Sequence, residues 1–346
     1  MAAYTYKGSG VDVGNADAVK KGMAGIMATG DPRVLNGVGG FASLYDGRFP
    51  DMECPVLVMK TEEPGSKQLL AIKEGRYGSI AFDMVNHLVN DIAVMGARPL
   101  AVQDAIICSK VDGGVVAALV AGIAEACVAN ECVLTGGETS EQPGVVAEGV
   151  YILTSSIVGV VDRGKVIDGA GTEEGDVVLA LESNGMHTNG YSLLRALMAD
   201  RPGIMREEVC GVPFMDEILR PHRPYYKVIK GLFGVCGIKS FAHITGGGIA
   251  GNLNRVLPDG LSAEIDLPAI RIPPIFRLIK ERGGVDDREM LATFNMGVGM
   301  TAVVSPERAD WAAGEVAKAG CRAYAIGEVR KGGDPVAFRG SLDWGA

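Results

Sequence analysis

Short apolar runs of strand length alternate with helical segments along this chain, and the pattern restarts after a polar, glycine-rich stretch at residues 163–176. Because 346 residues exceed one ordinary hydrophobic core, the pattern predicts an α+β protein of two α/β domains, 1–168 and 169–346. Strands are expected at 54–59, 100–109, 132–135, 149–161, 176–183 and 239–244, and in VGMTAVV and AYAIGEV. Helices are expected at 79–97 with Ser79 as a cap, at 113–130, 190–199 and 224–235, and in GIAGNLNRVL and ERADWAAGEVAKAG.

Charge and cysteine content restrict the class of protein. A formal net charge of −9 argues against a broad nucleic-acid surface, which needs a basic patch. The N-terminus lacks a basic region followed by an apolar core, and no apolar stretch reaches the ~18 uninterrupted residues that span a bilayer. Seven cysteines without CxxC spacing indicate reduced, buried thiols. We therefore expect a cytoplasmic protein that binds neither nucleic acid nor membrane.

The helical segment 79–97 carries a polar stripe. Asp83, His87, Asn90 and Asp91 fall at i, i+4, i+7 and i+8, so they share one face, while apolar residues form another. Magnesium uses such sparse carboxylate ligation when nucleotide phosphates complete its shell. The alternative is an amphipathic helix that turns its polar face to water. The absence of Lys and Arg from the stripe favours a metal site.

Two further acids lie at strand positions or strand ends. Asp104 interrupts the apolar run LAVQDAIICS, and Glu138 follows the glycine pair Gly136–Gly137 in TGGETSEQPG. Paired glycines allow backbone to approach a ligand closely. Each acid alone is weak support, but together with the helix stripe they indicate a centre that binds phosphate and metal.

Several glycine-rich segments offer backbone N–H groups, although NGVGGFASL at 36–44 and GSK at 65–67 do not match a Walker loop. The turn HITGGGIAGNL places three glycines where a helix begins, so its N–H groups could receive a phosphate. His187 lies in the loop SNGMHTNGYSL, and in such a loop a histidine is more often a surface residue than a catalytic one. His222 and His243 are interpreted as structural.

The motifs YKGSGVD, NGVGGF, VNDIAVMGARP, GGETSEQPG, HTNGYSL, ITGGG and FNMGVGM occur in an order that resembles the phosphoribosylformylglycinamidine cyclo-ligases, also called AIR synthetases. The resemblance covers practically the whole chain. It implies a homodimer whose N-terminal domains form a β-barrel interface, with a C-terminal α/β domain beside each. It also implies that ATP phosphorylates the formamide oxygen of formylglycinamidine ribonucleotide and that the amidine nitrogen then closes the ring, the fifth step of purine synthesis.

The same resemblance assigns roles to individual residues, with ATP and magnesium as cofactors. The catalytic candidates are His187, Lys67 and Asp91, with His187 as the proton carrier during cyclisation. The metal ligands are Glu62, Asp83, Asp91 and Glu138. ATP is assigned to Gly37, Gly39, Gly40, Gly65, Ser66, Lys67, Asn90, Asp104, Gly136 and Gly137. The substrate is assigned to His187, Thr188, Asn189, Thr245, Gly246, Gly247 and Gly248.

One stretch departs from the family pattern. TEEPGSK at 61–67 stands where family members usually read TDGVGTK. Glu63 in place of glycine adds charge and removes backbone freedom, and Pro64 pushes Glu63 toward an extended conformation. Two alternatives follow from this departure: another ATP-dependent enzyme of the superfamily, such as a thiamine-monophosphate kinase, or a catalytically silent nucleotide-binding paralogue.

Overall fold

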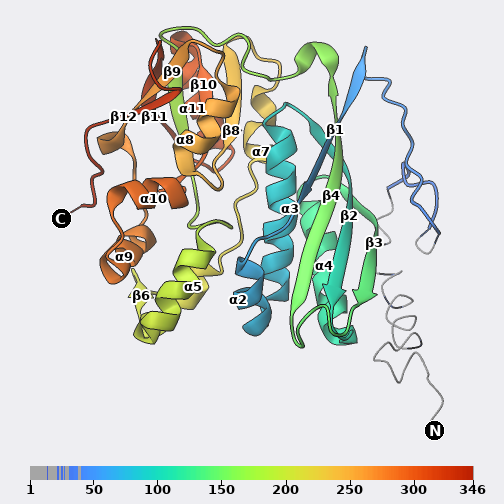
Figure 1. Ribbon diagram of the computed structural model, residues 1–346. Helices are drawn as coiled ribbons and strands as arrows, with labels where there is room; N and C mark the ends of the chain where they lie inside the picture. Colours follow the sequence, from blue (N-terminus) through green and yellow to red (C-terminus); the bar gives the residue numbers. More distant parts are fainter. Residues whose placement is uncertain are drawn as a thin grey trace. The chain divides into compact units, whose positions relative to one another are not determined.

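The structure, a computed structural model, describes residues 31–37 and 40–345, together with Gly14, Gly22, Gly25 and Met27. These residues form two compact units, each a mixture of helices and strands (Figure 1). Unit 1 contains the described residues up to Val89 and Arg98–Asp162, and unit 2 contains Asn90–Ala97 and the described residues from Arg163 onward. The α+β class is confirmed. The domain boundary between residues 168 and 169 stays a prediction.

Unit 1 is built on a four-stranded sheet in the order β1-β4-β2-β3. β1 and β2 pair antiparallel with β4, and β2 pairs parallel with β3. Helix α4 provides the crossover that a parallel pair requires, and it contacts β3. The bounds are β1 Pro55–Glu62, α2 Lys67–Lys73, α3 Tyr77–Ala93, β2 Arg98–Cys108, α4 Gly113–Ala129, β3 Val133–Glu141 and β4 Tyr151–Asp162.

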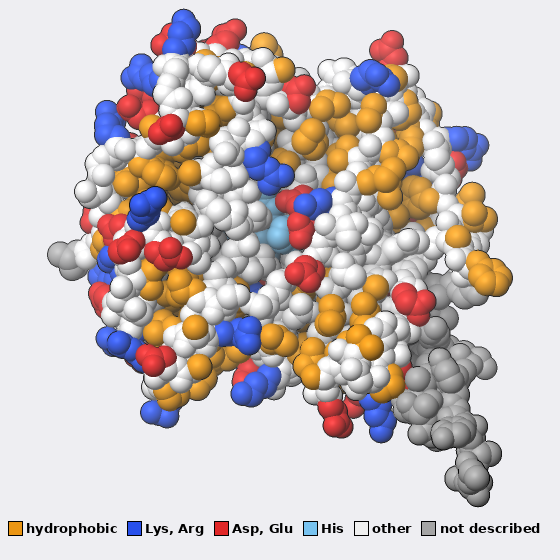
Figure 2. All heavy atoms as spheres, viewed as in Figure 1, with side chains coloured by type: hydrophobic (Ala, Val, Ile, Leu, Met, Phe, Trp, Pro, Cys, Tyr) orange, Lys and Arg blue, Asp and Glu red, His pale blue; other side chains and the backbone are white. Residues whose placement is uncertain are grey.

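The two faces of this sheet differ in burial. On β2 and β4, alternate residues such as Val102, Ile106 and Leu153 are fully buried. The opposite face carries apolar side chains that reach solvent: Leu57 is 51% exposed, Met59 70% and Ile152 37%. In Figure 2 hydrophobic side chains gather at the right of the view, over the region where Figure 1 draws these strands. The described strands of one chain form an open sheet and no closed barrel.

Unit 2 is built on a six-stranded sheet in the order β12-β9-β11-β5-β10-β8. All pairs are antiparallel except β12 with β9. Every residue of β10 is buried, which explains why VGMTAVV is almost wholly apolar rather than alternating. The bounds are β5 Val177–Glu182, β8 Ile238–His243, β9 Leu261–Asp266, β10 Val298–Val304, β11 Ala323–Lys331 and β12 Val336–Arg339.

Helices flank the sheet of unit 2, and α11 contacts β11 and β5 while α8 contacts β8 (Figure 1). A two-stranded ribbon joins β6 Glu208–Val209 to β7 Val212–Pro213. The helices are α5 Tyr191–Asp200, α6 Phe214–Ile218, α7 Tyr226–Ile229, α8 Gly248–Leu253, α9 Pro274–Gly283, α10 Asp287–Thr293 and α11 Ala309–Lys318. The last residues of α3, from Asn90 on, also belong to this unit.

Some details differ from the sequence predictions. Helix α3 begins at Tyr77, so Ser79 lies inside its first turn and does not cap it. The segment 224–235 forms only the short helix α7 and a 3₁₀ turn at Lys230–Leu232. Cys54, Cys210 and Cys236 are exposed rather than buried. Helices α9 and α10 and strands β9 and β12 were not predicted.

The start of α4 is fixed by a side-chain cap. The Asp112 carboxylate accepts hydrogen bonds from the backbone N–H groups of Gly114 and Val115, at 2.8 and 3.1 Å. These donors have no partner within the helix, so the cap satisfies them. Although α4 is largely apolar, no helix in the described part of the chain has both the length and the apolar character to cross a bilayer.

Replacing Asp112 with alanine should lower the free energy of unfolding by about 1 kcal/mol, because two helix donors lose their acceptor. Urea unfolding followed by circular dichroism measures the change. Lys110→Ala, at an exposed position two residues earlier, is the control and should leave the midpoint unchanged. Equal midpoints for the two variants would contradict the role of the cap.

Candidate active site

In unit 2, the loop that contains HTNG is held by the FNMGVGM motif. Asn295 donates through Nδ2 to the Gly185 carbonyl oxygen at 2.9 Å, and its Oδ1 accepts from the Gly297 N–H and the Ser183 hydroxyl. A Cβ at Gly190, the residue that directly precedes α5, would overlap the ring of Phe294. The two motifs are far apart in sequence, but the structure makes them one packed assembly.

The ring of His187 has a defined orientation. The Asn184 amide donates through Nδ2 to the Pro221 carbonyl oxygen at 2.9 Å, so its Oδ1 faces His187 Nε2 at 3.0 Å. Because an amide oxygen only accepts, Nε2 carries the hydrogen, and Nδ1 is the basic nitrogen of the neutral ring. His187 is 2% exposed and has φ of 60°, a left-handed conformation that is uncommon outside glycine and often marks functional positions.

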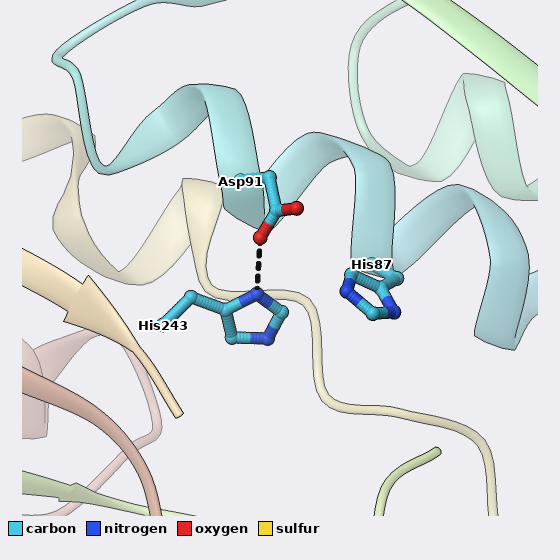
Figure 3. A group of neighbouring side chains, drawn as sticks. All are labelled: His87, Asp91 and His243. Carbon is cyan, nitrogen blue, oxygen red and sulfur yellow. Dashed lines mark hydrogen bonds and ion pairs between the residues drawn. The ribbon is translucent and has the colours of Figure 1, made fainter. Parts of the chain in front are cut away.

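A chain of hydrogen bonds links Asp91 to this loop. Asp91 Oδ1 lies 2.7 Å from His243 Nδ1, and Figure 3 shows this contact, with His87 one turn earlier than Asp91 on α3. His243 Nε2 lies 2.9 Å from His222 Nε2, and His222 Nδ1 lies 3.4 Å from the Thr188 hydroxyl. His222 and His243 are buried, in agreement with the structural interpretation, but they also connect two predicted site residues.

Asn90 holds the segment that carries His222. Its Nδ2 donates to the Arg223 carbonyl oxygen at 2.9 Å, and its Oδ1 accepts from the Tyr225 N–H at 2.7 Å. Asn90 is fully buried, so the side chain predicted to bind ATP is engaged with backbone in this structure. The Tyr225 hydroxyl donates to the Glu182 carbonyl oxygen at 2.7 Å, and burial raises the pKa of that hydroxyl well above its usual value.

The TGGG turn lies next to Asn189. A Cβ at Gly246 would lie 3.4 Å from Asn189 Oδ1, and the buried Nδ2 of Asn189 has no hydrogen-bond partner among the described residues. Gly247 and Gly248 have φ of 89° and 62°, so the turn depends on glycine. Asn252 donates to the carbonyl oxygens of Gly246 and Gly248, which fixes the backbone between Thr245 and α8.

In unit 1, Lys67 and Asp83 form a buried ion pair. Lys67 Nζ lies 2.9 and 2.8 Å from the two carboxylate oxygens of Asp83, and neither side chain is exposed. Burial lowers the pKa of Lys67, and the Asp83 carboxylate opposes that shift. In this structure the ammonium group faces Asp83 and not solvent. The roles of Lys67 as phosphate cation and Asp83 as metal ligand therefore stay predictions that require this pair to change partners.

The sheet register of unit 1 puts Glu62, Ser155 and Asp104 in one row across β1, β4 and β2. Ser155 is 2% exposed, and its Oγ has no hydrogen-bond partner in the described part of the chain. Burial raises the pKa of Asp104 to about 7. Gly137 is the next residue in the row, and a Cβ there would overlap the Asp104 carboxylate.

The other predicted residues of unit 1 lie on loops or at the surface. Glu62 forms an ion pair with Lys60 at 2.7 Å. Gly65 lies in the turn before α2 and has φ of 63°. Ser66 is the residue that directly precedes α2. Glu138 is exposed on β3, one residue past Gly137 and so on the opposite face from Asp104. Gly37, Gly40 and Gly136 border a loop that Ser43 fastens to β3 through the Thr135 carbonyl oxygen, 2.6 Å away. Gly39 and the YKGSGVD motif lie outside the described residues.

Three residues near His187 were not singled out from the sequence. Asn184 sets the tautomer of His187, and Tyr225 approaches its ring with centroids 6.1 Å apart. Gly299 leaves room for Tyr225 and His187, because a Cβ there would overlap the Tyr225 hydroxyl and lie 2.6 Å from His187 Cε1. The motifs themselves held a signal, since Asn184 lies in SNGMHTNG and Gly299 in FNMGVGM. Tyr225 carried none.

Comparison with known proteins matches two family models to most of the chain. The AIR synthase related protein N-terminal domain matches residues 52–161, and the corresponding C-terminal domain matches residues 173–339. The chain is 41% identical over 333 residues to the phosphoribosylformylglycinamidine cyclo-ligase of Methylobacillus flagellatus, covering 95% of each. It is 40% identical over 345 residues to the cyclo-ligase of Bacillus cytotoxicus, covering 99% of each.

Solved structures share this fold at low sequence identity. Thiamine-monophosphate kinase from Stenotrophomonas maltophilia has a TM-score of 0.70 and 17% identity, covering 94% of this chain and 96% of its own. Hydrogenase maturation protein HypE in complex with ATP has a TM-score of 0.63 and 18% identity, covering 88% of this chain and 84% of its own. At these identities the similarity concerns the fold alone.

The Asp104 carboxyl should make stability depend on pH. Its pKa in the folded protein is about 7, above the usual value of 3.8, so between pH 4 and 7 the folded state binds more protons than the unfolded state. Its contribution therefore lowers the free energy of unfolding as pH rises through that window, by up to about 4 kcal/mol. In Asp104→Asn this loss should be absent, as measured by urea unfolding without nucleotide.

Asp310→Asn provides the control, because it changes an exposed carboxyl near the start of α11 in unit 2. Its unfolding free energy should follow that of the unsubstituted protein at each pH. Parallel curves for Asp104→Asn and the unsubstituted protein would show that the Asp104 carboxyl is not the source of the pH dependence.

Proposed function

Because the chain belongs to the phosphoribosylformylglycinamidine cyclo-ligase family, we propose that it closes the imidazole ring of aminoimidazole ribonucleotide from formylglycinamidine ribonucleotide, with ATP converted to ADP and phosphate. This is an ATP-dependent ligase reaction and the fifth step of purine synthesis. A cytoplasmic location belongs to the same proposal.

The chemistry requires activation followed by ring closure. An amide oxygen is a poor leaving group. Transfer of the γ-phosphoryl group of ATP to that oxygen turns it into a phosphorylated oxygen, which leaves readily as phosphate. The amidine nitrogen then attacks the activated carbon, the carbon–oxygen bond breaks, and the nitrogen loses a proton. Phosphoryl transfer depends mainly on positioning and charge neutralisation, whereas ring closure needs a base near the nitrogen.

The observation that carries the proposal is the orientation of His187. Its contact with Asn184 makes Nδ1 the basic nitrogen, and an imidazole titrates near the pH at which such enzymes work. The ring is buried in a loop whose motif is part of the family resemblance. We assign the proton transfer of ring closure to His187 Nδ1.

The polar groups of unit 1 suit a nucleotide with magnesium. Carboxylate oxygens are the ligands that magnesium prefers, and the row of Glu62, Ser155 and Asp104 supplies two carboxyl groups and a buried hydroxyl with an unused hydrogen-bonding capacity. When bound, magnesium would neutralise charge on the transferring phosphate. Lys67 and Asp83 form an ion pair with each other in this structure, so binding of either one to nucleotide or metal would require this pair to separate.

The TGGG turn of unit 2 is our proposed site for the substrate. Asn189 carries a buried amide donor with no hydrogen-bond partner among the residues described, and it lies against Gly246. A polar ligand group at this turn would satisfy that donor, and a buried donor left unsatisfied costs about 1–3 kcal/mol. Thr188 precedes Asn189 and is buried as well.

The test is product formation by the purified protein with magnesium–ATP and formylglycinamidine ribonucleotide. We expect ADP and aminoimidazole ribonucleotide in equal amounts, and ADP only when the substrate is present. His187→Asn should reduce kcat by about 10²–10⁴-fold, the usual contribution of a general base, while the thermal unfolding midpoint stays close to that of the unsubstituted protein.

Two outcomes would count against the proposal. ATP binding without substrate-dependent ADP release would exclude the cyclo-ligase activity and favour a silent nucleotide-binding protein or another substrate. Normal product formation by His187→Asn would keep the activity but remove His187 as the base.

We also propose that the open face of the unit 1 sheet forms a homodimer interface. Leu57, Met59 and Ile152 expose apolar surface there, and paired apolar sheet faces would bury it. Sedimentation should therefore give a species of about twice the monomer mass of 36.1 kDa. Met59→Asp should shift the protein to monomer, because a charge would be placed in the interface.

Met205→Asp is the matched control. Met205 is also an exposed methionine, 42% accessible, but it lies in unit 2. This variant should remain dimeric. A monomeric unsubstituted protein, or a Met59→Asp variant that stays dimeric, would exclude this face as the interface.

A further inference from the structure

We propose that His222 is a positioning residue that holds His187 and Thr188 in place for ring closure by connecting them to the Asp91–His243 pair. The proposal rests on the function assigned to His187 above. Every residue in the argument belongs to unit 2. His222 itself is fully buried, so it acts through its neighbours and not through contact with solvent.

His222 makes three different contacts through one ring. Its face stacks on His187 with ring centroids 3.9 Å apart and an interplanar angle of 19°. Its Nε2 lies 2.9 Å from His243 Nε2, and its Nδ1 lies 3.4 Å from the Thr188 hydroxyl. A single side chain thereby touches both residues that begin the HTNG motif.

The direction of each hydrogen bond follows from Asp91. A carboxylate accepts, so His243 carries its hydrogen on Nδ1 and, in the neutral ring, offers the lone pair of Nε2. His222 must then donate from Nε2, which leaves its Nδ1 as an acceptor for the Thr188 hydroxyl. Asp91 thus sets the tautomers of two successive rings and the orientation of the hydroxyl group.

The backbone on both sides of His222 is anchored. Before it, the Pro221 carbonyl oxygen accepts from Asn184, the residue that orients His187. After it, Asn90 binds the Arg223 carbonyl oxygen and the Tyr225 N–H. These contacts fix where the ring of His222 lies, so this ring can restrict the movement of the His187 ring that stacks on it.

The ring of His187 is enclosed by the His222 ring and two other groups. Tyr225 approaches it edge-on, and the backbone of Gly299 lies so close that a Cβ would come within 2.6 Å of Cε1. Removing the His222 ring opens one side of this enclosure, and the hydrogen bond to Asn184 alone would not keep Nδ1 in a single direction. Even a small displacement of a reacting group lowers the reaction rate considerably.

The kinetic test compares three substitutions in the full-length protein. His222→Ala removes all three contacts, His222→Phe keeps a ring that can stack, and His222→Asn keeps hydrogen-bonding groups without the ring. We expect kcat to fall at least tenfold for alanine and less for phenylalanine and asparagine, with smaller changes in KM. Lys227→Ala, at an exposed position of α7, should leave both constants unchanged.

A spectroscopic test does not depend on catalysis. The chain contains 4 histidines, so a protein labelled with ¹⁵N-histidine gives four pairs of ring-nitrogen signals, and the pair of His187 is identified by its loss in His187→Asn. In His222→Phe and His222→Asn the His187 signals should shift or broaden without any ligand, while Lys227→Ala leaves them in place. Thermal unfolding shows whether each variant is folded. If His222→Phe does not fold, the comparison is made with His222→Asn.

The two tests separate the two proposals. If the unsubstituted protein makes no aminoimidazole ribonucleotide, the proposed function fails, and the His187 signals still decide whether His222 positions that ring. If the protein is active but folded His222 variants retain kcat and unchanged His187 signals, the positioning role of His222 is excluded.

Discussion

Helix α3 buries polar side chains that cannot remain without partners, and much of the structure follows from this requirement. Asp83, Asn86 and Asn90 are at most 1% exposed. Each has a specific partner: Lys67 for Asp83, Asn130 for Asn86, and the backbone of Arg223 and Tyr225 for Asn90. Because a buried polar group that loses its partner costs about 1–3 kcal/mol, and a buried charge more, these contacts constrain how neighbouring segments pack.

The same helix contributes its final residues to the histidine chain of unit 2. Asp91 lies at one end of that chain, His243 and His222 follow it through hydrogen bonds, and the ring of His222 stacks on the ring of His187. The strained backbone lies at the other end, where His187 and Met296 both have positive φ and belong to interlocking motifs. The well-packed interior therefore supports strained loops that present one basic nitrogen and several glycine turns. This arrangement is typical of a site organised before its ligand arrives.

The sequence predicted the elements of regular structure better than the surroundings of the polar residues. Helical spacing placed Asp83 and Asn90 on one polar stripe, but the alternative that this stripe faces water is wrong, because both are fully buried. Spacing reveals which residues share a face, but it does not reveal that Lys67 or the backbone at 223–225 covers that face.

For His187 the surface interpretation is wrong for the same reason, since Tyr225 and His222, which come from a distant segment, enclose it. His222 carried no local signal at all, because its three partners lie on other segments of the chain. The metal and nucleotide roles of the acidic residues stay predictions.

Gly299 limits how this sequence can diverge. The space that a side chain would need at this position is already occupied by the Tyr225 hydroxyl and approached by the His187 ring. A descendant that replaces Gly299 must therefore also lose or shrink Tyr225, and it then releases the Glu182 carbonyl oxygen that this hydroxyl binds. The two residues need separate codon changes, so a sequence that gains a side chain at position 299 before Tyr225 changes would carry this overlap in its interior. Gly299, near the start of a buried strand, is therefore expected to be retained together with Tyr225 from another part of the chain.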